Sequence, residues 1–206
     1  MSEYYMFNKP RGCITARRDT RQKTVMDYFP EGKRDVLFPV GRLDKDTEGF
    51  ILITDDGKLC FELMSPENLV PKTYFFWVQG VLSLNKIHEL ESGVSIYKNS
   101  PYETSPAKIA VERVGVLRQI KNLLIGDDIK LSNKRGELPV TAGYITITEG
   151  KKHQVKRMLR YAGCRVVYLK RVSIGQVSLD QTLALGKYRK MSKDEILKLK
   201  KQALIE

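Results

Sequence analysis

Cysteine, histidine and long apolar runs are scarce in this chain of 206 residues. The three cysteines are far apart and odd in number, which fits no zinc motif and argues against a structural disulfide. Two histidines without HxxxH spacing leave little for a metal site. No apolar run approaches the ~20 residues of a membrane helix, and the N-terminus lacks the pattern of a signal peptide. We therefore expect a cytoplasmic protein with no membrane association.

Acidic residues are also few relative to basic ones, with 24 against 36 and a net charge of +12. Excess positive charge favours a polyanionic partner, because each phosphate that is neutralised releases counterions. Charge alone fits RNA, DNA or an acidic membrane surface. The hydrophobic share of 42% excludes a disordered chain, and the length permits one large domain or two small lobes.

The most informative stretch is Val40 to Lys58, which reads VGRLDKDTEGFILITDDGK. Its segment Phe50 to Thr54 is apolar and rich in β-branched residues, and turn residues flank it on both sides, so it predicts a buried central strand. The preceding loop, from Gly41 to Glu48, contains three acids and two bases. A charged loop beside a rigid strand is suited to holding a reactive group. In isolation, however, the GRLD tetrapeptide would be a surface turn with a salt bridge.

Further elements follow from periodicity and from capping residues. We expect helices at 58–64, 83–92 and 152–162, and a last helix capped by Ser192 and Glu195. We expect strands at 4–7, 74–81, 107–114, 144–148, 166–169 and 171–177. The segment 115–139 is the least readable, and we interpret it as an insertion with a strand at 129–131 and a basic turn at 134–136.

The helix expected at 152–162 has two distinct faces. At 100° per residue, one arc carries basic side chains, namely His153, Lys156, Arg157 and Arg160. The opposite arc carries apolar ones, namely Val155, Met158, Leu159 and Ala162. A solvated basic face is the ordinary interpretation, and a face that binds nucleic acid is the functional one.

The block GRLDxxTxGhhhhTxDG, where h is apolar, resembles the catalytic motif of the RsuA, RluB, RluE and RluF type of ribosomal RNA pseudouridine synthases. Three other family motifs occur in the family order: KPxG from Lys9, KTY from Lys72 and EGxxHQVKRM from Glu149. The resemblance implies that Asp44 is the catalytic aspartate, that Tyr74 stacks on the target base and that Lys156 pairs with Asp44.

The resemblance also implies an α+β fold, with a central mixed and mostly antiparallel sheet flanked by helices and with a basic active-site cleft. The implied reaction converts one uridine of ribosomal RNA to pseudouridine and needs no cofactor and no metal. Small-subunit (16S) RNA is the favoured substrate, and large-subunit (23S) RNA stays open. Whether Asp44 acts as nucleophile or base is also open. The residues expected to bind RNA are Lys9, Arg11, Arg42, Lys72, Lys152, His153 and Arg157.

We expect one catalytic domain spanning 1–206, or two lobes at roughly 1–65 and 66–206, acting as a monomer. Because KPxG begins at Lys9, we expect no S4 domain ahead of it, unlike in many family members. Two other classes of function are open. A metal-dependent RNA nuclease would use aspartates as ligands, namely Asp44, Asp46, Asp55 and Asp56. A non-catalytic ribosome-assembly factor would only bind RNA.

Overall fold

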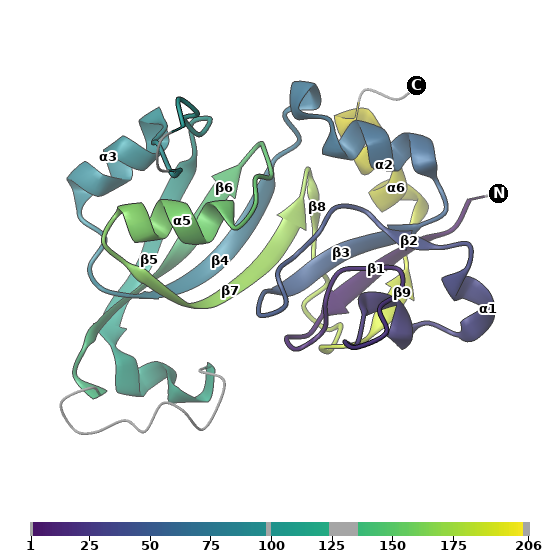
Figure 1. Cartoon of the computed structure of the whole chain (residues 1–206), viewed down its shortest axis with the longest axis horizontal. Coiled ribbons are helices and arrows are strands. Elements are labelled where there is room, and N and C mark those ends of the chain that lie inside the picture. The colour runs from purple at the N-terminus through teal and green to yellow at the C-terminus, as the bar shows by residue number, and fades with distance from the viewer. Residues whose placement is uncertain (1, 98–99, 124–135, 204–206) are drawn as a thin grey trace. The chain divides into compact units, whose positions relative to one another are not determined.

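The computed structural model describes residues 2–97, 100–123 and 136–203, and it divides into two compact units (Figure 1). Unit 1 comprises Met1–Lys72 and Lys170–Glu206, and unit 2 comprises Thr73–Leu169. These units differ from the expected lobes at 1–65 and 66–206, because the C-terminal segment belongs with the N-terminal one. Strand pairing between distant segments produces this division, and two strands, β4 (Lys72–Gln79) and β7 (Arg165–Ile174), continue from one unit into the other.

Unit 1 is built around β3 (Glu48–Thr54), in which every residue is buried. β1 (Tyr4–Lys9) pairs with it antiparallel, and β9 (Tyr188–Lys190) pairs with the other edge of β1. The other partners of β3 are β2 (Phe38–Pro39), which is antiparallel, and the end of β7, which is parallel. β8 (Val177–Ser178) forms a hairpin with β7. The expected central strand is therefore confirmed.

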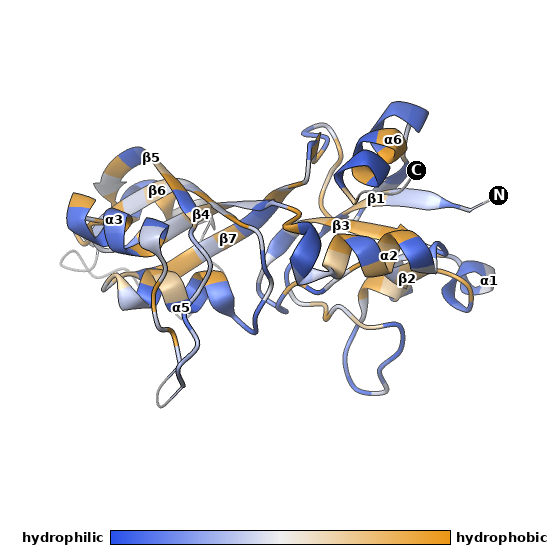
Figure 2. Ribbon diagram, turned by 90° about the horizontal axis from the view of Figure 1, so that it is seen from above, coloured by the Kyte–Doolittle hydropathy of each residue, from blue (hydrophilic) through white to orange (hydrophobic). Residues whose placement is uncertain are grey.

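Both faces of this sheet are covered, which explains why the centre of β3, Phe50 to Ile53, is apolar. Met6, Phe50 and Leu52 pack with residues of α2 (Gly57–Met64) and α6 (Lys193–Gln202). On the opposite face of β1, the rings of Tyr5 and Phe7 contact an aromatic group that includes Phe29 and Tyr188. Figure 2 shows the apolar colouring concentrated on β3. The short helices of this unit are η1 (Val25–Tyr28), α1 (Glu31–Arg34) and η2 (Pro66–Asn68).

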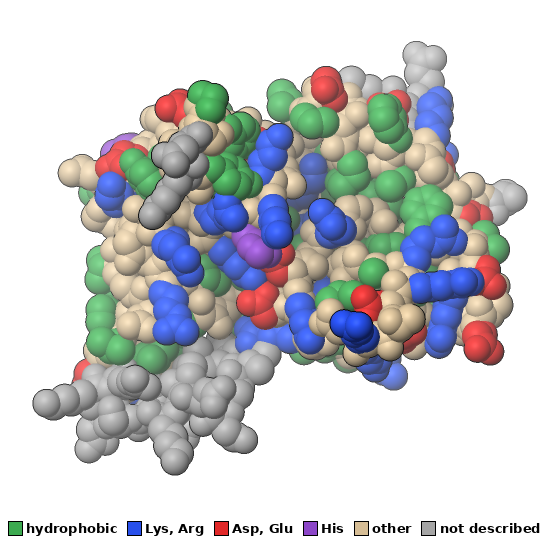
Figure 3. Space-filling view, viewed as in Figure 1, with side chains coloured by type: hydrophobic (Ala, Val, Ile, Leu, Met, Phe, Trp, Pro, Cys, Tyr) green, Lys and Arg blue, Asp and Glu red, His purple; other side chains and the backbone are tan. Residues whose placement is uncertain are grey.

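Unit 2 contains the strand order β5 (Lys108–Val116), β6 (Pro139–Ile147), β4 and β7. Its helices are α3 (Leu84–Ser92), η3 (Leu117–Leu123) and α5 (Gln154–Tyr161). Helix α5 lies across one face of the strands (Figures 1 and 2). Figure 3 shows Lys and Arg side chains gathered on the face of unit 2 that carries this helix. A small core forms around Trp77, Leu117, Ile120, Val140 and Ala142.

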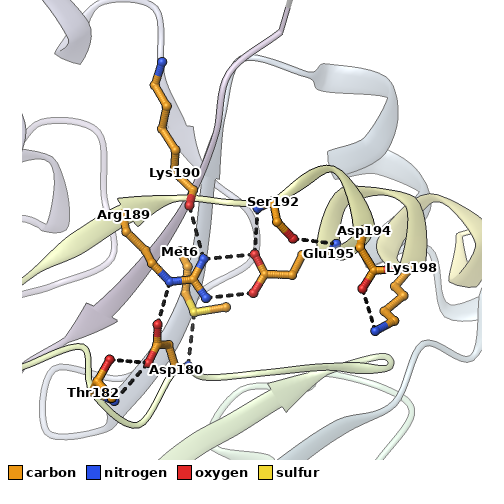
Figure 4. Close-up of polar contacts among 9 residues, drawn as sticks. All are labelled: Met6, Asp180, Thr182, Arg189, Lys190, Ser192, Asp194, Glu195 and Lys198. Carbon is orange, nitrogen blue, oxygen red and sulfur yellow. Dashed lines mark hydrogen bonds and ion pairs between the residues drawn. The ribbon is translucent and has the colours of Figure 1, made fainter.

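Within unit 1, a network of charged side chains around Arg189 joins β9 to α6 (Figure 4). Its guanidinium donates to Asp180 Oδ2 at 2.7 Å and to both carboxylate oxygens of Glu195, at 2.7 and 2.9 Å. The hydrogen bond from Thr182 and the pair with Arg189 lower the pKa of Asp180 to about 2. Glu195 and Ser192 also cap α6 reciprocally, as the sequence predicts.

The fold class is α+β with a mixed and mostly antiparallel set of strands, as expected. One element prediction is wrong: 166–169 and 171–177 are not two strands, because β7 runs unbroken through Lys170. The strand expected at 129–131 and the bases of the turn expected at 134–136 lie outside the described residues. No described helix has both the length and the apolar character that crossing a membrane requires.

Candidate active site

Buried hydrogen bonds connect the loop that carries Asp44 to the KPRG turn at the end of β1. Lys9 is fully buried, and its Nζ donates to the carbonyl oxygens of Lys45 at 3.3 Å and Thr47 at 2.9 Å. The amide of Gly12 donates to the same Lys45 carbonyl at 2.9 Å. Asp44 itself is half-buried at the start of this bonded segment. Two motifs far apart in sequence thus form one local structure.

Two more contacts fix the loop on either side of Asp44. Thr15 Oγ1 donates to the Leu43 carbonyl at 2.9 Å, and the Leu43 amide donates to the same hydroxyl at 3.1 Å. After Asp44, Arg11 Nε lies 3.2 Å from Glu48 Oε1, with both side chains 10% exposed. The backbone before and after the carboxylate is therefore tied to the segment that follows β1.

These contacts bear on the role expected for Lys9 and Arg11. Burial lowers the pKa of the Lys9 ammonium, and the charges of neighbouring acidic groups oppose this effect. An ammonium enclosed by backbone carbonyls has no surface left for a phosphate contact. Both residues contact the Asp44 loop, and their role in binding RNA stays a prediction. Arg42, in contrast, is exposed, as an RNA-binding residue must be.

The glycine of the TEG segment is required by a close approach of two strands. Gly49 has φ +104° and faces Arg171 across the parallel β3–β7 pairing. A Cβ placed on Gly49 would lie 2.2 Å from the Arg171 carbonyl oxygen, so no other residue fits here without moving a strand. The side chain of Arg171 is 3% exposed, and its Nε donates to the Phe50 carbonyl at 2.7 Å. The sequence interpretation missed this buried arginine.

Lys72 is a second buried cation of unit 1, and not the exposed RNA-binding residue that we expected. Its side chain is 5% exposed, and its Nζ lies 3.4 Å from the Leu63 carbonyl oxygen. Burial, with a smaller contribution from the charge of Arg171, lowers the pKa of Lys72 to about 8. The KTY lysine therefore contributes to the interior of unit 1 at the base of the strand that carries Tyr74.

Tyr74 lies two residues into β4 and is 9% exposed. It shares its strand face with Phe76 and Val78, both fully buried, as the alternation predicts. Next to it, the hydroxyl of Thr73 is 2.9 Å from that of Thr146 in β6, which links the two strands. The ring of Tyr74 is thus carried by a rigid strand of unit 2, a suitable support for a stacking surface.

Helix α5 has the two faces that the sequence predicts. Val155, Met158 and Leu159 are buried, while Lys156 is half-buried on the polar side. The helix begins at Gln154 and not at Lys152, because His153 adopts a left-handed conformation with φ 55°. Three residues expected to bind RNA lie here, with Lys152 and His153 exposed and Arg157 half-buried.

Glu149 is a residue of this region whose role the sequence interpretation missed. Its carboxylate accepts hydrogen bonds from Tyr102 Oη, from the Ser105 amide at 2.8 Å and from Gln154 Nε2 at 2.6 Å. Gln154 in turn accepts from the Lys151 amide at 2.9 Å. Glu149 and Gln154 therefore fix the turn that leads into α5. The EGxxHQ spacing is the sequence feature that could have predicted this contact.

The aspartates that a metal-dependent nuclease would need are partly used by the fold. Asp56 caps α2 by accepting from the Leu59 amide at 2.9 Å, and it also accepts from Tyr4 Oη at 2.6 Å. Asp55 accepts from the Glu3 amide at 2.8 Å. Within the described residues no group of three or more His, Cys, Asp or Glu side chains could hold a metal ion.

The protein-family comparison agrees with this arrangement. Residues 3–161 match the model of the RNA pseudouridylate synthase family. Among curated proteins, the chain is 45% identical over 194 residues to the uncharacterized RNA pseudouridine synthase YtzG of Bacillus subtilis, which covers 94% of this chain and 71% of that protein. It is 33% identical over 199 residues to ribosomal small subunit pseudouridine synthase A of Haemophilus influenzae, which covers 97% of this chain and 74% of that one.

Solved structures give the same result. A crystal structure of a pseudouridylate synthase superposes with a TM-score of 0.78 at 32% identity, covering 97% of this chain and 74% of the other. A human RNA pseudouridylate synthase domain protein, at 14% identity and a TM-score of 0.51, shares the fold alone. On the extent of the family match and the identity to these relatives, the chain is a member of the RNA pseudouridylate synthase family.

Proposed function

We propose that this enzyme isomerises one uridine of ribosomal RNA to pseudouridine, with small-subunit RNA as substrate and Asp44 as the catalytic carboxylate. The observation that carries the proposal is the loop of Asp44. A half-buried carboxylate stands on a segment fixed by Lys9, Thr15 and Arg11 before a fully buried strand. Such preorganisation is what a catalytic group requires, because displacement by about 1 Å can cost a large factor in rate.

The reaction breaks the N1–C1′ bond of the uridine and forms a C5–C1′ bond. Asp44 either attacks C1′, forming an ester bond that breaks when C5 bonds to C1′, or removes the C2′ proton, which returns to C2′ when that bond forms. In both cases the uracil turns so that C5 faces the sugar. The product has the same atoms as the substrate, since C5 loses a proton and N1 gains one. The target base must leave its stack first. In this proposal Tyr74 then provides a planar partner for it, and the charge of Lys156 stabilises the ionised carboxylate.

The other proposed contacts hold RNA outside the reacting base. Arg42, Lys152, His153 and Arg157 would bind phosphates, in the basic cleft that the family resemblance implies. Several relatives at 32–34% identity are named ribosomal small subunit pseudouridine synthases, which supports small-subunit RNA as the substrate. Lys9, Arg11 and Lys72 contribute to the structure of unit 1.

The test is a pseudouridine map of both ribosomal RNAs from cells with the gene, without it, and with Asp44→Asn in its place. We expect one small-subunit pseudouridine to vanish in the deletion strain, to return with the wild-type gene, and to stay absent with Asp44→Asn. Loss of a large-subunit site would correct the substrate. An unchanged map, or full modification by Asp44→Asn, would disprove the proposed activity or the catalytic role.

A further inference from the structure

Two tyrosines of unit 2, Tyr97 and Tyr102, lie beside the start of α5. Close to them in sequence, the Thr104 amide donates to the Val94 carbonyl at 2.9 Å, and the Val94 amide donates to Thr104 Oγ1 at 3.0 Å. Tyr97 and Tyr102 contact each other edge to face, with ring centroids 5.7 Å apart. The motifs of the reaction do not include either tyrosine.

Both tyrosine rings are paired with cations from the α5 region. The guanidinium carbon of Arg157 lies 4.4 Å from the ring centroid of Tyr97, and Nζ of Lys151 lies 5.1 Å from that of Tyr102. Tyr97 Oη donates to the Lys152 carbonyl at 3.4 Å. Surfaces that bind single-stranded nucleic acid commonly combine aromatic rings, on which bases stack, with cations that bind phosphates.

Glu149, an acid that contacts this group, is held by hydrogen bonds from neutral donors. Glu149 uses its two oxygens for Tyr102 Oη, the Ser105 amide and Gln154 Nε2. Among the described residues, the Arg157 side chain has no ion-pair or hydrogen-bond partner, and Tyr97 is only partly buried. A guanidinium that lies over a ring and keeps its donors can stack on a base and bind a phosphate.

The other cation–ring pair of α5 shows what a purely structural contact looks like here. Lys86 lies 4.8 Å from the ring centroid of Tyr161, near the C-terminal end of the helix. There Glu89 accepts from Lys86 Nζ at 2.7 Å and from Tyr161 Oη at 2.8 Å, so the cation is neutralised. Two pairs with the same chemistry on one helix thus differ in whether the cation has an acidic partner.

We infer that Tyr97 and Arg157 form a binding site for an unpaired nucleotide of the substrate RNA. The base stacks on the Tyr97–Arg157 pair, and Lys151 and Lys152 lie where they can bind its neighbouring phosphates. Glu149 holds Tyr102 and Ser105 beside the turn that leads into α5, so Tyr102 and Glu149 act as positioning residues. This inference rests on the proposed function, because it takes RNA as the substrate.

The experiment measures the affinity of the full-length protein for a labelled single-stranded oligoribonucleotide of about twelve nucleotides and for the duplex of the same sequence. Tyr97→Leu removes the ring, and we expect it to weaken binding to the single strand about tenfold, the cost of one lost stack. Tyr97→Phe should bind like the wild type. Arg157→Met should weaken binding and lower the slope of log affinity against log salt by about 0.7, the value for one phosphate on a single strand.

Tyr161→Leu is the matched control, because it removes a ring beneath a neutralised cation on the same helix. It should leave affinity within about twofold of wild type, and unfolding midpoints should show that every variant is folded. The inference is overturned if Tyr97→Leu binds the single strand like wild type, or if it weakens single strand and duplex equally.

The pseudouridine map separates this inference from the proposed function. If the wild-type enzyme modifies RNA but Tyr97→Leu binds the single strand normally, only the nucleotide site is disproved. If no pseudouridine depends on the gene but the Tyr97 effect persists, the reaction is disproved and the RNA site stands.

Discussion

The ammonium group of Lys9 donates a 2.9 Å hydrogen bond to the carbonyl oxygen of Thr47, across 38 positions of sequence. This bond joins the end of β1 to the loop that carries Asp44. Buried ammonium groups are costly unless their donors are satisfied, and here backbone carbonyls satisfy them. The KPxG lysine is therefore placed to fix the geometry of the Asp44 loop.

Lys9→Met should loosen the Asp44 loop. The variant keeps the stem but leaves the carbonyls of Lys45 and Thr47 without their donor, which costs about 1–3 kcal/mol for a buried group and is partly offset by removal of a desolvated charge. We expect lower stability in urea unfolding and a lower single-turnover rate. Lys45→Met, in the same loop but with an exposed side chain, should stay within about 0.5 kcal/mol of wild type. Wild-type stability and rate in Lys9→Met would contradict this role.

Asp44→Asn should abolish chemistry and preserve the fold. The substitution keeps the size of the side chain and removes its charge, so neither nucleophilic attack nor proton abstraction remains. We expect no detectable pseudouridine, with the free energy of unfolding changed by less than about 1–2 kcal/mol. Asp46→Asn is the control within the same loop. Single-turnover assays on a ribosomal RNA fragment would refute the assignment if Asp44→Asn reacted within about tenfold of wild type.

What the sequence predicts well in this chain is local. The strand at Phe50–Thr54 and the two faces of α5 follow from patterns within a few residues, and the structure confirms both. The last strand of unit 1, β9, was not predicted, because its three residues form a strand only by pairing with β1. The return of the C-terminal segment to unit 1 depends on the same pairing.

The candidate site is predictable in its motifs but not in how its charges are used. Lys9 and Lys72 were predicted to bind RNA, whereas the structure buries both side chains. Burial of a cation depends on carbonyl groups supplied by distant segments, such as Thr47 for Lys9. The buried Arg171 and the bonds of Glu149 depend on such contacts too, and periodicity carries no signal for them.

Tyr74→Phe and Tyr74→Leu should differ in their effect on turnover. Phenylalanine keeps the planar surface and loses only the hydroxyl, so RNA binding and appreciable activity should remain. Leucine fills a similar place at the start of β4 but offers no planar partner to the displaced uracil, and a lost base–aromatic stack costs about 1–3 kcal/mol. Single-turnover rates on one RNA fragment decide the matter. A leucine variant faster than the phenylalanine variant would make Tyr74 a packing residue.

Lys72 should make the stability of the protein depend on pH in the alkaline range. Its pKa is about 8 in the folded state and 10.5 as the ordinary value, so the folded state binds fewer protons between these limits. The free-energy cost of burying the charged ammonium is present in full below pH 8 and decreases as the pH rises toward 10.5. At about 1.4 kcal/mol per pH unit, the relief is at most about 3 kcal/mol.

Lys72→Met should therefore be more stable than wild type at pH 7, and the difference should shrink as pH rises from about 8 to 10. Urea unfolding at each pH measures it, and taking the difference between the two proteins cancels the titration of groups that they share. Lys58→Met, an exposed lysine of α2, should show a constant difference from wild type. A constant difference for Lys72→Met as well would mean that the ammonium remains hydrated in the folded protein.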